Sequence, residues 1–224
     1  MNPFSADTHP KAQIMCTTAN RYHGGHKSVL WSKTVDEIAK ALLSLTASGK
    51  GGNPLDVEAA FALWTDWTVQ IRVQKRTVFL IGNGASASMA SHVAADLAKN
   101  AHVHTEVFTD LALITAIAND MSFRDIFSEP LKRRLTKGDM VVAISSSGQS
   151  PNILRAAQTT LSLGGKVVTL SAMRSENPLR RLGDLNLYIP TQTYGMAETC
   201  HAGLLHFWID KIVSGNNILL QDTE

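Results

Sequence analysis

Hydrophobic residues recur at helical spacing over residues 29–45 and again over 55–76, which predicts two amphipathic helices. Between them, residues 49–54 combine three glycines with an asparagine and a proline, a composition typical of a turn. Both helices precede the first continuous apolar run of the chain. The sequence therefore predicts an N-terminal helical pair over 28–76, ahead of the first strand.

Beyond this pair, short apolar runs alternate with amphipathic stretches. The apolar runs predict buried strands over 77–81, 105–108, 140–144, 167–170 and 185–189. The stretches between and after them predict helices over 87–99, 122–135, 151–163, 178–182 and 196–213. Residues 111–118 are apolar and fit a strand or a helix equally well. Because short strands that alternate with helices pair in parallel, we expect an α/β fold, a doubly wound five-stranded parallel sheet flanked by helices.

The two ends of the chain differ from this α/β body. Residues 1–27 are rich in polar residues, glycine and proline and show no apolar period, which predicts an irregular arm. We expect residues 28–224 to form a single domain, with the α/β body over 77–213 and a tail over 214–224.

Composition and charge exclude several classes of protein. The chain has 224 residues, of which 44% are hydrophobic and 18% charged, so it is globular. The net charge is +2 and the basic residues are spread along the chain, so neither nucleic acid nor a membrane surface is an expected partner. No apolar run approaches the roughly 20 residues of a membrane span. With no secretory signal pattern and with only Cys16 and Cys200, we expect a cytoplasmic protein.

The first candidate binding loop follows the strand predicted over 77–81. Gly82 to Ser86 reads Gly-Asn-Gly-Ala-Ser. The loop lacks the third glycine of a dinucleotide-binding fingerprint and the lysine of a phosphate-binding P-loop. It nevertheless combines glycines, a hydroxyl and a helix start, and this combination suits an anion.

The second candidate loop follows the strand predicted over 140–144. Its four hydroxyls surround Gly148 and come from Ser145, Ser146, Ser147 and Ser150. Ser150 is expected to cap the next helix, with Pro151 at the first helical position. Hydroxyls and free backbone N–H groups at a helix start can bind a phosphate, although a serine-rich turn with a helix cap explains the same residues. Because ligands of open α/β sheets bind beyond the carboxyl ends of strands, the two loops together favour phosphate binding.

Two helical faces carry candidate chemistry. His92 and Asp96 lie four residues apart and share one face, and Glu198 and His206 lie eight apart and share another, toward which His201 also leans. Such groups can hold Zn²⁺ or a similar ion, or act as a general acid and base. Each pair taken alone is more often structural.

In their order and spacing these motifs resemble the sugar isomerase (SIS) domain superfamily and, within it, the phosphoheptose isomerases. The resemblance covers roughly residues 30–215. It rests on Ile81–Ser86, His92-x3-Asp96, Ala118–Asp120 with Asp125–Phe127, Ile144–Asn152, and Glu198-x2-His201-x4-His206.

The resemblance implies a fold, an activity and an assembly. It implies a five-stranded parallel sheet behind an N-terminal helical pair, in a homotetramer with active sites at subunit contacts. The implied activity is the aldose–ketose isomerisation of a phosphosugar, sedoheptulose 7-phosphate to heptose 7-phosphate, in lipopolysaccharide biosynthesis. Proton transfer would pass through a cis-enediol, with one Zn²⁺ per subunit.

The resemblance also implies roles for particular residues. The implied substrate-binding residues are Asn83, Ser86, Asn119, Asp120, Ser145, Ser146, Ser147, Ser150 and Glu198. The implied metal ligands are His92, Asp96, Glu198 and His206, of which Asp96 and His206 would also transfer the protons.

Three positions depart from the family pattern. The family has glutamate at Asp96, glutamine at Glu198 and an acidic residue at Gly195. The first two changes keep oxygen ligands, so a metal site is retained in principle. The alternative is a non-catalytic phosphosugar- or partner-binding module, which resembles the initiator-associating factor of bacterial replication. The presence of histidines and carboxylates at all four metal positions favours the enzyme.

Overall fold

The computed structural model describes residues 30–221, so the arm predicted over 1–27 and the last three residues of the predicted tail lie outside the described residues. The seven strands are β1 Thr46–Gly49, β2 Pro54–Leu55, β3 Thr77–Gly82, β4 His104–Val107, β5 Met140–Ser145, β6 Lys166–Ala172 and β7 Leu185–Ile189. The α-helices are α1 Trp31–Leu43, α2 Val57–Val73, α3 Ala85–Ala101, α4 Leu111–Asp120, α5 Ser128–Arg134, α6 Pro151–Ser162 and α7 Tyr194–Gln221. Three short 3₁₀ turns are η1 Lys50–Gly52, η2 Phe123–Asp125 and η3 Leu179–Arg181.

The strands form one sheet in the order β2-β1-β7-β6-β5-β3-β4. The five strands from β7 to β4 are parallel, as the sequence predicts. The chain moves outward from β3 to β4 and then returns to the other side of β3 to form β5. The direction of winding thus reverses between β3 and β5, where open α/β sheets bind ligands at the carboxyl edge.

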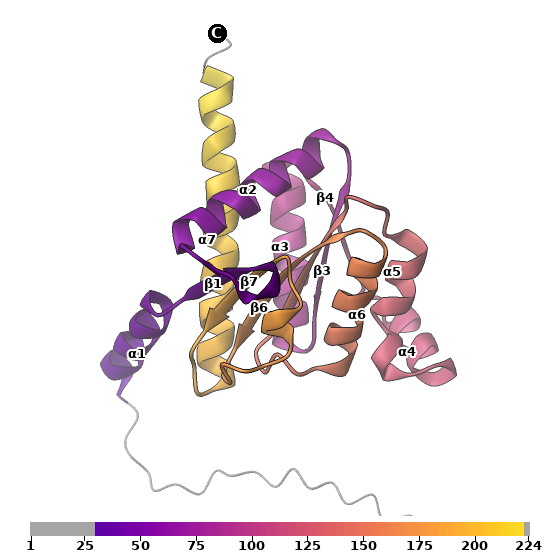
Figure 1. Cartoon of the computed structure of the whole chain (residues 1–224), viewed down its shortest axis with the longest axis horizontal. Helices are drawn as coiled ribbons and strands as arrows, with labels where there is room; N and C mark the ends of the chain where they lie inside the picture. Colours follow the sequence, from indigo (N-terminus) through magenta and orange to yellow (C-terminus); the bar gives the residue numbers. More distant parts are fainter. Residues whose placement is uncertain (1–29, 222–224) are drawn as a thin grey trace, which may run out of the picture.

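The two faces of the sheet bury separate cores (Figure 1). Along β3, Val78 and Leu80 face a core shared with α2, α3 and α7, while Phe79 and Ile81 face a core shared with α4, α5 and α6. In the first core Trp64 of α2 stacks on Trp208 of α7, with ring centroids 4.0 Å apart and neither side chain exposed. This contact fixes α7 against the body of the fold.

The N-terminal hairpin is the main difference from the predicted fold. The turn expected over 49–54 is flanked by β1 and β2, which pair antiparallel with each other, and β1 also pairs antiparallel with β7. Thr46 pairs with Tyr188 and Gly49 with Leu185. The strands are short and include glycine and proline, so they carry no apolar run that a periodicity search would detect. The sheet therefore has seven strands, although its parallel part has the expected five.

Smaller differences concern helix boundaries. The helix predicted over 122–135 is a 3₁₀ turn followed by α5, because Pro130 has no N–H and is tolerated only in the first turn of a helix. Residues 111–118 are helical, and the Asp110 side chain caps α4 by accepting from the backbone N–H of Leu113 at 2.8 Å. α7 continues past residue 213, into the predicted tail.

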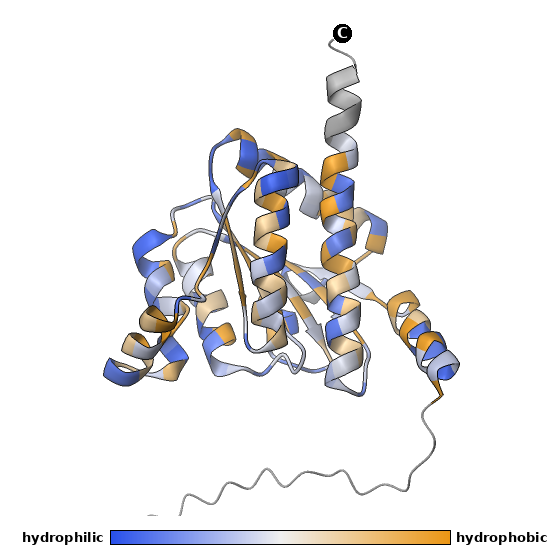
Figure 2. Ribbon diagram, turned by 180° about the vertical axis from the view of Figure 1, so that it is seen from behind, coloured by the Kyte–Doolittle hydropathy of each residue, from blue (hydrophilic) through white to orange (hydrophobic). Residues whose placement is uncertain are grey.

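α1 lies at the edge of the fold and keeps much of its apolar surface in solvent. Figure 2 shows hydrophobic residues along this helix, away from the α/β body. Among its side chains, Trp31 is 79% exposed and Leu43 88%, while Ala41 is buried. Over the part of the chain that the structure describes, no helix is long and apolar enough to cross a membrane.

Candidate functional site

The loops after β3 and β5 and the start of α7 enclose a small pocket at the carboxyl edge of the sheet. Its volume is about 170 Å³. It is lined by Asn83, Ser86, Ile144, Ser145, Ser146, Ser147, Ser150, Tyr194 and Glu198. We call it the serine pocket. The structure thus brings both candidate loops together where the winding of the sheet reverses.

Two glycines allow the pocket to form. A Cβ on Gly82 would lie 2.5 Å from the backbone of Ser86, so only glycine lets the first loop fold back so tightly. Gly148 has φ +61°, and a Cβ there would lie 2.0 Å from Oδ1 of Asn177. The second loop is further held by the backbone N–H of Ala172, which donates to the carbonyl of Ser146 at 3.1 Å. The backbone of the pocket is therefore closely fixed.

The side chains of the pocket present hydroxyls and amides. The hydroxyls of Ser145 and Ser150 are 3.3 Å apart and hydrogen-bonded. Ser150 is the N-cap residue of α6 and Pro151 occupies its first turn, as expected, but the Ser150 side chain makes no capping hydrogen bond. Its hydroxyl is engaged with Ser145 instead. The Asn83 side chain exchanges two hydrogen bonds with that of Asn152, at 3.0 and 2.8 Å.

The charge of the serine pocket is unusual for an anion site. Among the nine lining residues none is lysine or arginine, and Glu198 carries a carboxylate. Attraction for a phosphate must therefore come from hydroxyls, loop N–H groups and the positive ends of α3 and α6. Glu198 opposes it.

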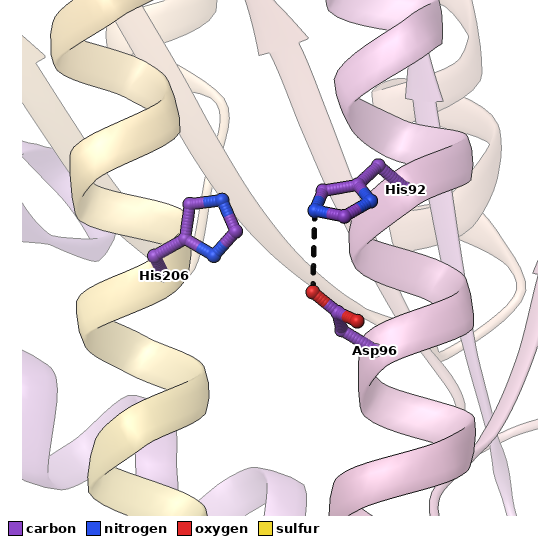
Figure 3. Close-up of side chains that lie close together, drawn as sticks. All are labelled: His92, Asp96 and His206. Atoms are coloured by element: carbon purple, nitrogen blue, oxygen red, sulfur yellow. Dashed lines mark ion pairs between the residues drawn. The ribbon is translucent and has the colours of Figure 1, made fainter.

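A second group of side chains lies on the facing surfaces of α3 and α7 (Figure 3). His92 Nε2 lies 3.3 Å from Asp96 Oδ2, and the ring centroids of His92 and His206 are 5.4 Å apart. One ligand atom from each of the three residues falls within 4.8 Å of the others. We call this group the histidine–aspartate cluster. Its exposure is uneven, since His92 is 61% exposed and Asp96 20%.

The cluster lies deeper along the helices than the serine pocket. α3 follows β3 and α7 follows β7, so both helices start at the carboxyl edge of the sheet and run back from it. At 1.5 Å per residue, His92 lies about 9 Å beyond Ser86, and His206 about 12 Å beyond Glu198. His92 and His206 therefore lie at a similar distance from the carboxyl edge of the sheet, further along the helices than the pocket residues Ser86 and Glu198.

The cluster suits a divalent metal ion. Two imidazole nitrogens and a carboxylate oxygen form a donor set that zinc accepts, and three protein ligands leave a position for substrate or water. Because the cluster is partly exposed, such a position can be reached from solvent. Glu198, the fourth expected ligand, is not in this group and lines the serine pocket instead.

Three other candidate residues lie away from both groups. Asn119 and Asp120 are exposed at the end of α4, where the Asn119 amide donates to the Asp120 carboxylate at 2.8 Å. They do not line the serine pocket. His201 is fully buried, and within the described residues neither ring nitrogen has a hydrogen-bond partner. Burial lowers its pKa to about 4, against a smaller opposite effect of the Ser171 backbone, so it is neutral at pH 7.

Sequence reasoning did not assign two of the lining residues to the site, Ile144 at the end of β5 and Tyr194. Tyr194 is the first residue of α7 and is 61% exposed. Its position before the helix predicted from residue 196 is the only signal that could have pointed to it.

Comparison with known proteins identifies relatives for this arrangement. The model of the SIS domain family matches residues 65–172, which include the serine pocket loops and the α3 part of the cluster. A phosphoheptose isomerase of Helicobacter pylori is 30% identical over 141 residues, 60% of this chain and 73% of the relative. One from Chlorobaculum parvum is 33% identical over 146 residues, 61% of this chain and 69% of the relative.

Solved structures show the same fold. The phosphoheptose isomerase of Neisseria gonorrhoeae superposes with a TM-score of 0.70 at 24% identity, covering 81% of this chain and 96% of that one. The expected α/β fold is therefore confirmed. Taken with the sequence relatives, the comparison shows that this chain belongs to the phosphoheptose isomerase family of SIS-domain proteins, a family of aldose–ketose phosphosugar isomerases.

Proposed function

We propose that this protein is a phosphosugar isomerase that interconverts sedoheptulose 7-phosphate and heptose 7-phosphate. One observation carries the proposal: a phosphate-sized pocket lies at the starts of α3 and α7, and a cluster of proton-transfer groups lies further along the same two helices. Their separation of about 9–12 Å along the helices matches an extended seven-carbon sugar phosphate with its phosphate at one end and its carbonyl at the other.

The serine pocket would hold the phosphate. The hydroxyls of Ser86, Ser145 and Ser147 would donate to phosphate oxygens, and the starts of α3 and α6 would add favourable dipoles. These contacts are the same for ketose and aldose, so they position the sugar and lower KM without favouring either direction. Asn83, held by Asn152, would meet the sugar beside the phosphate.

Asp96 and His206 would carry out the proton transfers at the other end of the sugar. A base removes a proton from the carbon next to the carbonyl, the electrons of that bond form a C=C bond, and the carbonyl oxygen takes up a proton, which gives a cis-enediol. An acid then returns a proton to the former carbonyl carbon while the hydroxyl on the neighbouring carbon loses its proton and becomes the new carbonyl, so no atom or electron is gained or lost overall. The two groups face each other across α3 and α7, which suits removal and return on adjacent carbons.

His92, Asp96 and His206 are also the residues that would hold a zinc ion. A bound ion would supply Lewis acidity to the carbonyl and enediol oxygens. Glu198, the fourth ligand expected from the sequence, lies two turns before His206 and lines the serine pocket, so the proposed ion site consists of the other three residues.

The experiment that tests this function measures metal content by elemental analysis and then turnover of sedoheptulose 7-phosphate with and without chelator. We expect about one zinc per chain and turnover that chelator abolishes and zinc restores. Turnover that is indifferent to chelator would contradict the metal site. Binding of the sugar phosphate without any turnover would contradict the isomerase.

The assembly we propose is a homotetramer with active sites at subunit contacts. The exposed apolar side chains of α1 support it, because an amphipathic helix with Trp31 and Leu43 in solvent lacks a covering partner within the described chain. Analytical ultracentrifugation should show a tetramer for the unmodified protein and smaller species for Trp31→Glu. Lys33→Glu changes the charge of the same helix on an exposed polar side chain and should leave the tetramer intact.

A further inference from the structure

Another cavity lies outside the serine pocket. Its volume is about 620 Å³, within the range of small-molecule sites and well above the 170 Å³ of the serine pocket. One wall is the β1–η1–β2 hairpin and the other is the segment from Ser175 to Arg181 that follows β6, which lie side by side in Figure 1. The cavity shares no lining residue with the serine pocket. We call it the hairpin cavity.

One arginine in this cavity is held in place from three sides. Arg180 donates through Nη1 to the carbonyl of Ser175 at 2.9 Å and through Nη2 to the hydroxyl of Thr46 at 3.1 Å. Its guanidinium carbon lies 4.2 Å from the ring centre of Tyr188. A guanidinium has five N–H donors, so these two bonds leave others for a ligand. Arg180 therefore bridges both walls as a positioned cation.

The backbone next to Arg180 is fixed as well. The side chain of the buried Asn177 donates to the carbonyl of Arg174 at 2.8 Å and accepts from the backbone N–H of Arg180 at 3.0 Å. The wall that carries the arginine is thus formed before any ligand binds, which lowers the entropic cost of binding.

A second arginine in the cavity is easily freed. Arg181 is paired with Glu176, and both side chains are at least 70% exposed. Exposed pairs of this kind contribute little to the stability of a protein. An anionic ligand can therefore replace Glu176 as the partner of Arg181 at little cost. The lining then offers two guanidinium groups to one anion.

The remaining lining is open and mixes polar groups with the apolar side chains of Ala47 and Pro54. The hairpin contributes the Ser48 hydroxyl and the glycines Gly51 and Gly52. Both glycines have positive φ, and a Cβ on either would meet nothing within 4 Å, so a ligand can approach this backbone closely. Such a mixed surface suits a ligand body that carries hydroxyl groups.

From these observations we propose that the hairpin cavity binds an organic phosphomonoester, with its phosphate on Arg180 and Arg181 and its polar body against the hairpin. The planar guanidinium fork matches phosphate oxygens in pairs. The volume admits far more than a bare ion. This second site is independent of the proposed catalytic function, since it uses different residues.

The test is isothermal titration calorimetry with ribose 5-phosphate as the probe and ribose as the control without phosphate. We expect two binding events on the unmodified protein and none of comparable strength with ribose. Arg181→Gln should weaken one event about tenfold or more, as expected for loss of a charged hydrogen-bonding partner. Ser147→Ala should weaken only the other event, so failure of one site is distinguishable from failure of the other.

Two further variants keep the test decisive. Arg133→Gln removes an arginine that is equally exposed and paired with Glu129, but it lies outside the cavity and should change neither event. Arg180→Lys keeps the charge, loses the planar fork and should weaken the same event as Arg181→Gln. The proposal is overturned if ribose binds as well as its phosphate, if Arg181→Gln leaves both events unchanged, or if Arg133→Gln has the same effect.

Discussion

The serine pocket and the histidine–aspartate cluster both use residues of α3 and α7 but are built in opposite ways. The pocket is formed by loops whose backbone is fixed by glycines, and Ser86, Ser145 and Ser146 are each only 5% exposed. The cluster lies on helix surfaces, and His92 is 61% exposed. Its geometry depends on i,i+4 spacing in α3 and on the packing of α3 against α7.

This difference assigns the two tasks of the proposed reaction. A preformed, closely fixed pocket suits recognition of a constant group, the phosphate. An open cluster of groups that exchange protons suits the end of the sugar where bonds change. Changes in the cluster should therefore reduce kcat, and changes in the pocket should raise KM.

The largest effect is expected in the cluster. His206→Asn removes one proton-transfer group and one ligand atom, and kcat for sedoheptulose 7-phosphate should fall by about 10²–10⁴-fold. The fold should be unaffected because the side chain is exposed. His102→Asn is the matched control: His102 is an exposed histidine at the end of α3 with φ +54°, which asparagine tolerates, and kcat should not change. A similar kcat for both variants would contradict the proton-transfer role proposed for His206.

The next largest effect is expected from a substitution that distorts the serine pocket. Gly148→Ala places a methyl group 2.0 Å from Asn177 Oδ1 on a backbone with φ +61°, so the serine loop must move. We expect KM to rise about tenfold or more and thermal stability to fall, through loss of aligned phosphate contacts. Gly195→Ala, where a Cβ meets nothing within 4 Å, should change neither. Steady-state kinetics and a melting curve check both variants, and an unchanged KM for Gly148→Ala would contradict phosphate binding by this loop.

A buried histidine on α7 contrasts with the exposed His206. Burial holds the pKa of His201 at about 4, below its ordinary 6.5, so between these pH values the unfolded chain binds a proton that the folded chain does not. The free energy of unfolding should therefore decrease as pH falls through this window, by roughly 3 kcal/mol when complete. His201→Leu removes the titrating group and should flatten this dependence in urea melts at several pH values. If the free energy of unfolding depends on pH in the same way in both proteins, groups other than His201 cause the acid sensitivity.

The smallest effect concerns the carboxylate in the serine pocket. Glu198→Gln removes a negative charge that faces the expected phosphate and should lower KM severalfold, in line with about 1 kcal/mol for a solvated charge pair. If Glu198 instead serves mainly as a metal ligand, zinc content by elemental analysis should fall and kcat should fall with it. Glu58→Gln, on an exposed residue of α2, is the control for the loss of one charge.

Much of the fold could be predicted from the pattern of residues. The five parallel strands are continuous apolar runs, and their alternation with helices determines how they pair. The hairpin of β1 and β2 could not be predicted, because Thr46–Gly49 and Pro54–Leu55 are too short and too polar to show a period. The break before α5 was predictable in principle from Pro130, whose missing N–H restricts it to a first helical turn.

The candidate site could be predicted only in part. The spacing of His92 and Asp96 implies a shared helix face, and the family resemblance adds His206 from a distant helix. Helical spacing places Glu198 two turns from His206 on α7. Whether the Glu198 side chain lines the serine pocket depends on the nearby loops, which periodicity does not describe. The exposed position of Asn119 and Asp120 likewise depends on how α4 packs, which no local pattern encodes.

The most direct test of the central claim is to follow sedoheptulose 7-phosphate by proton NMR in D₂O with the unmodified, zinc-loaded protein. Isomerisation through an enediol should yield heptose 7-phosphate and replace hydrogen by solvent deuterium at the carbons next to the carbonyl. Both changes should be about 10²–10⁴-fold slower with His206→Asn, and sedoheptulose without its phosphate should react far more slowly than the phosphate. Absence of both product and exchange, in a protein that binds the sugar phosphate in its serine pocket, would contradict the proposed isomerase.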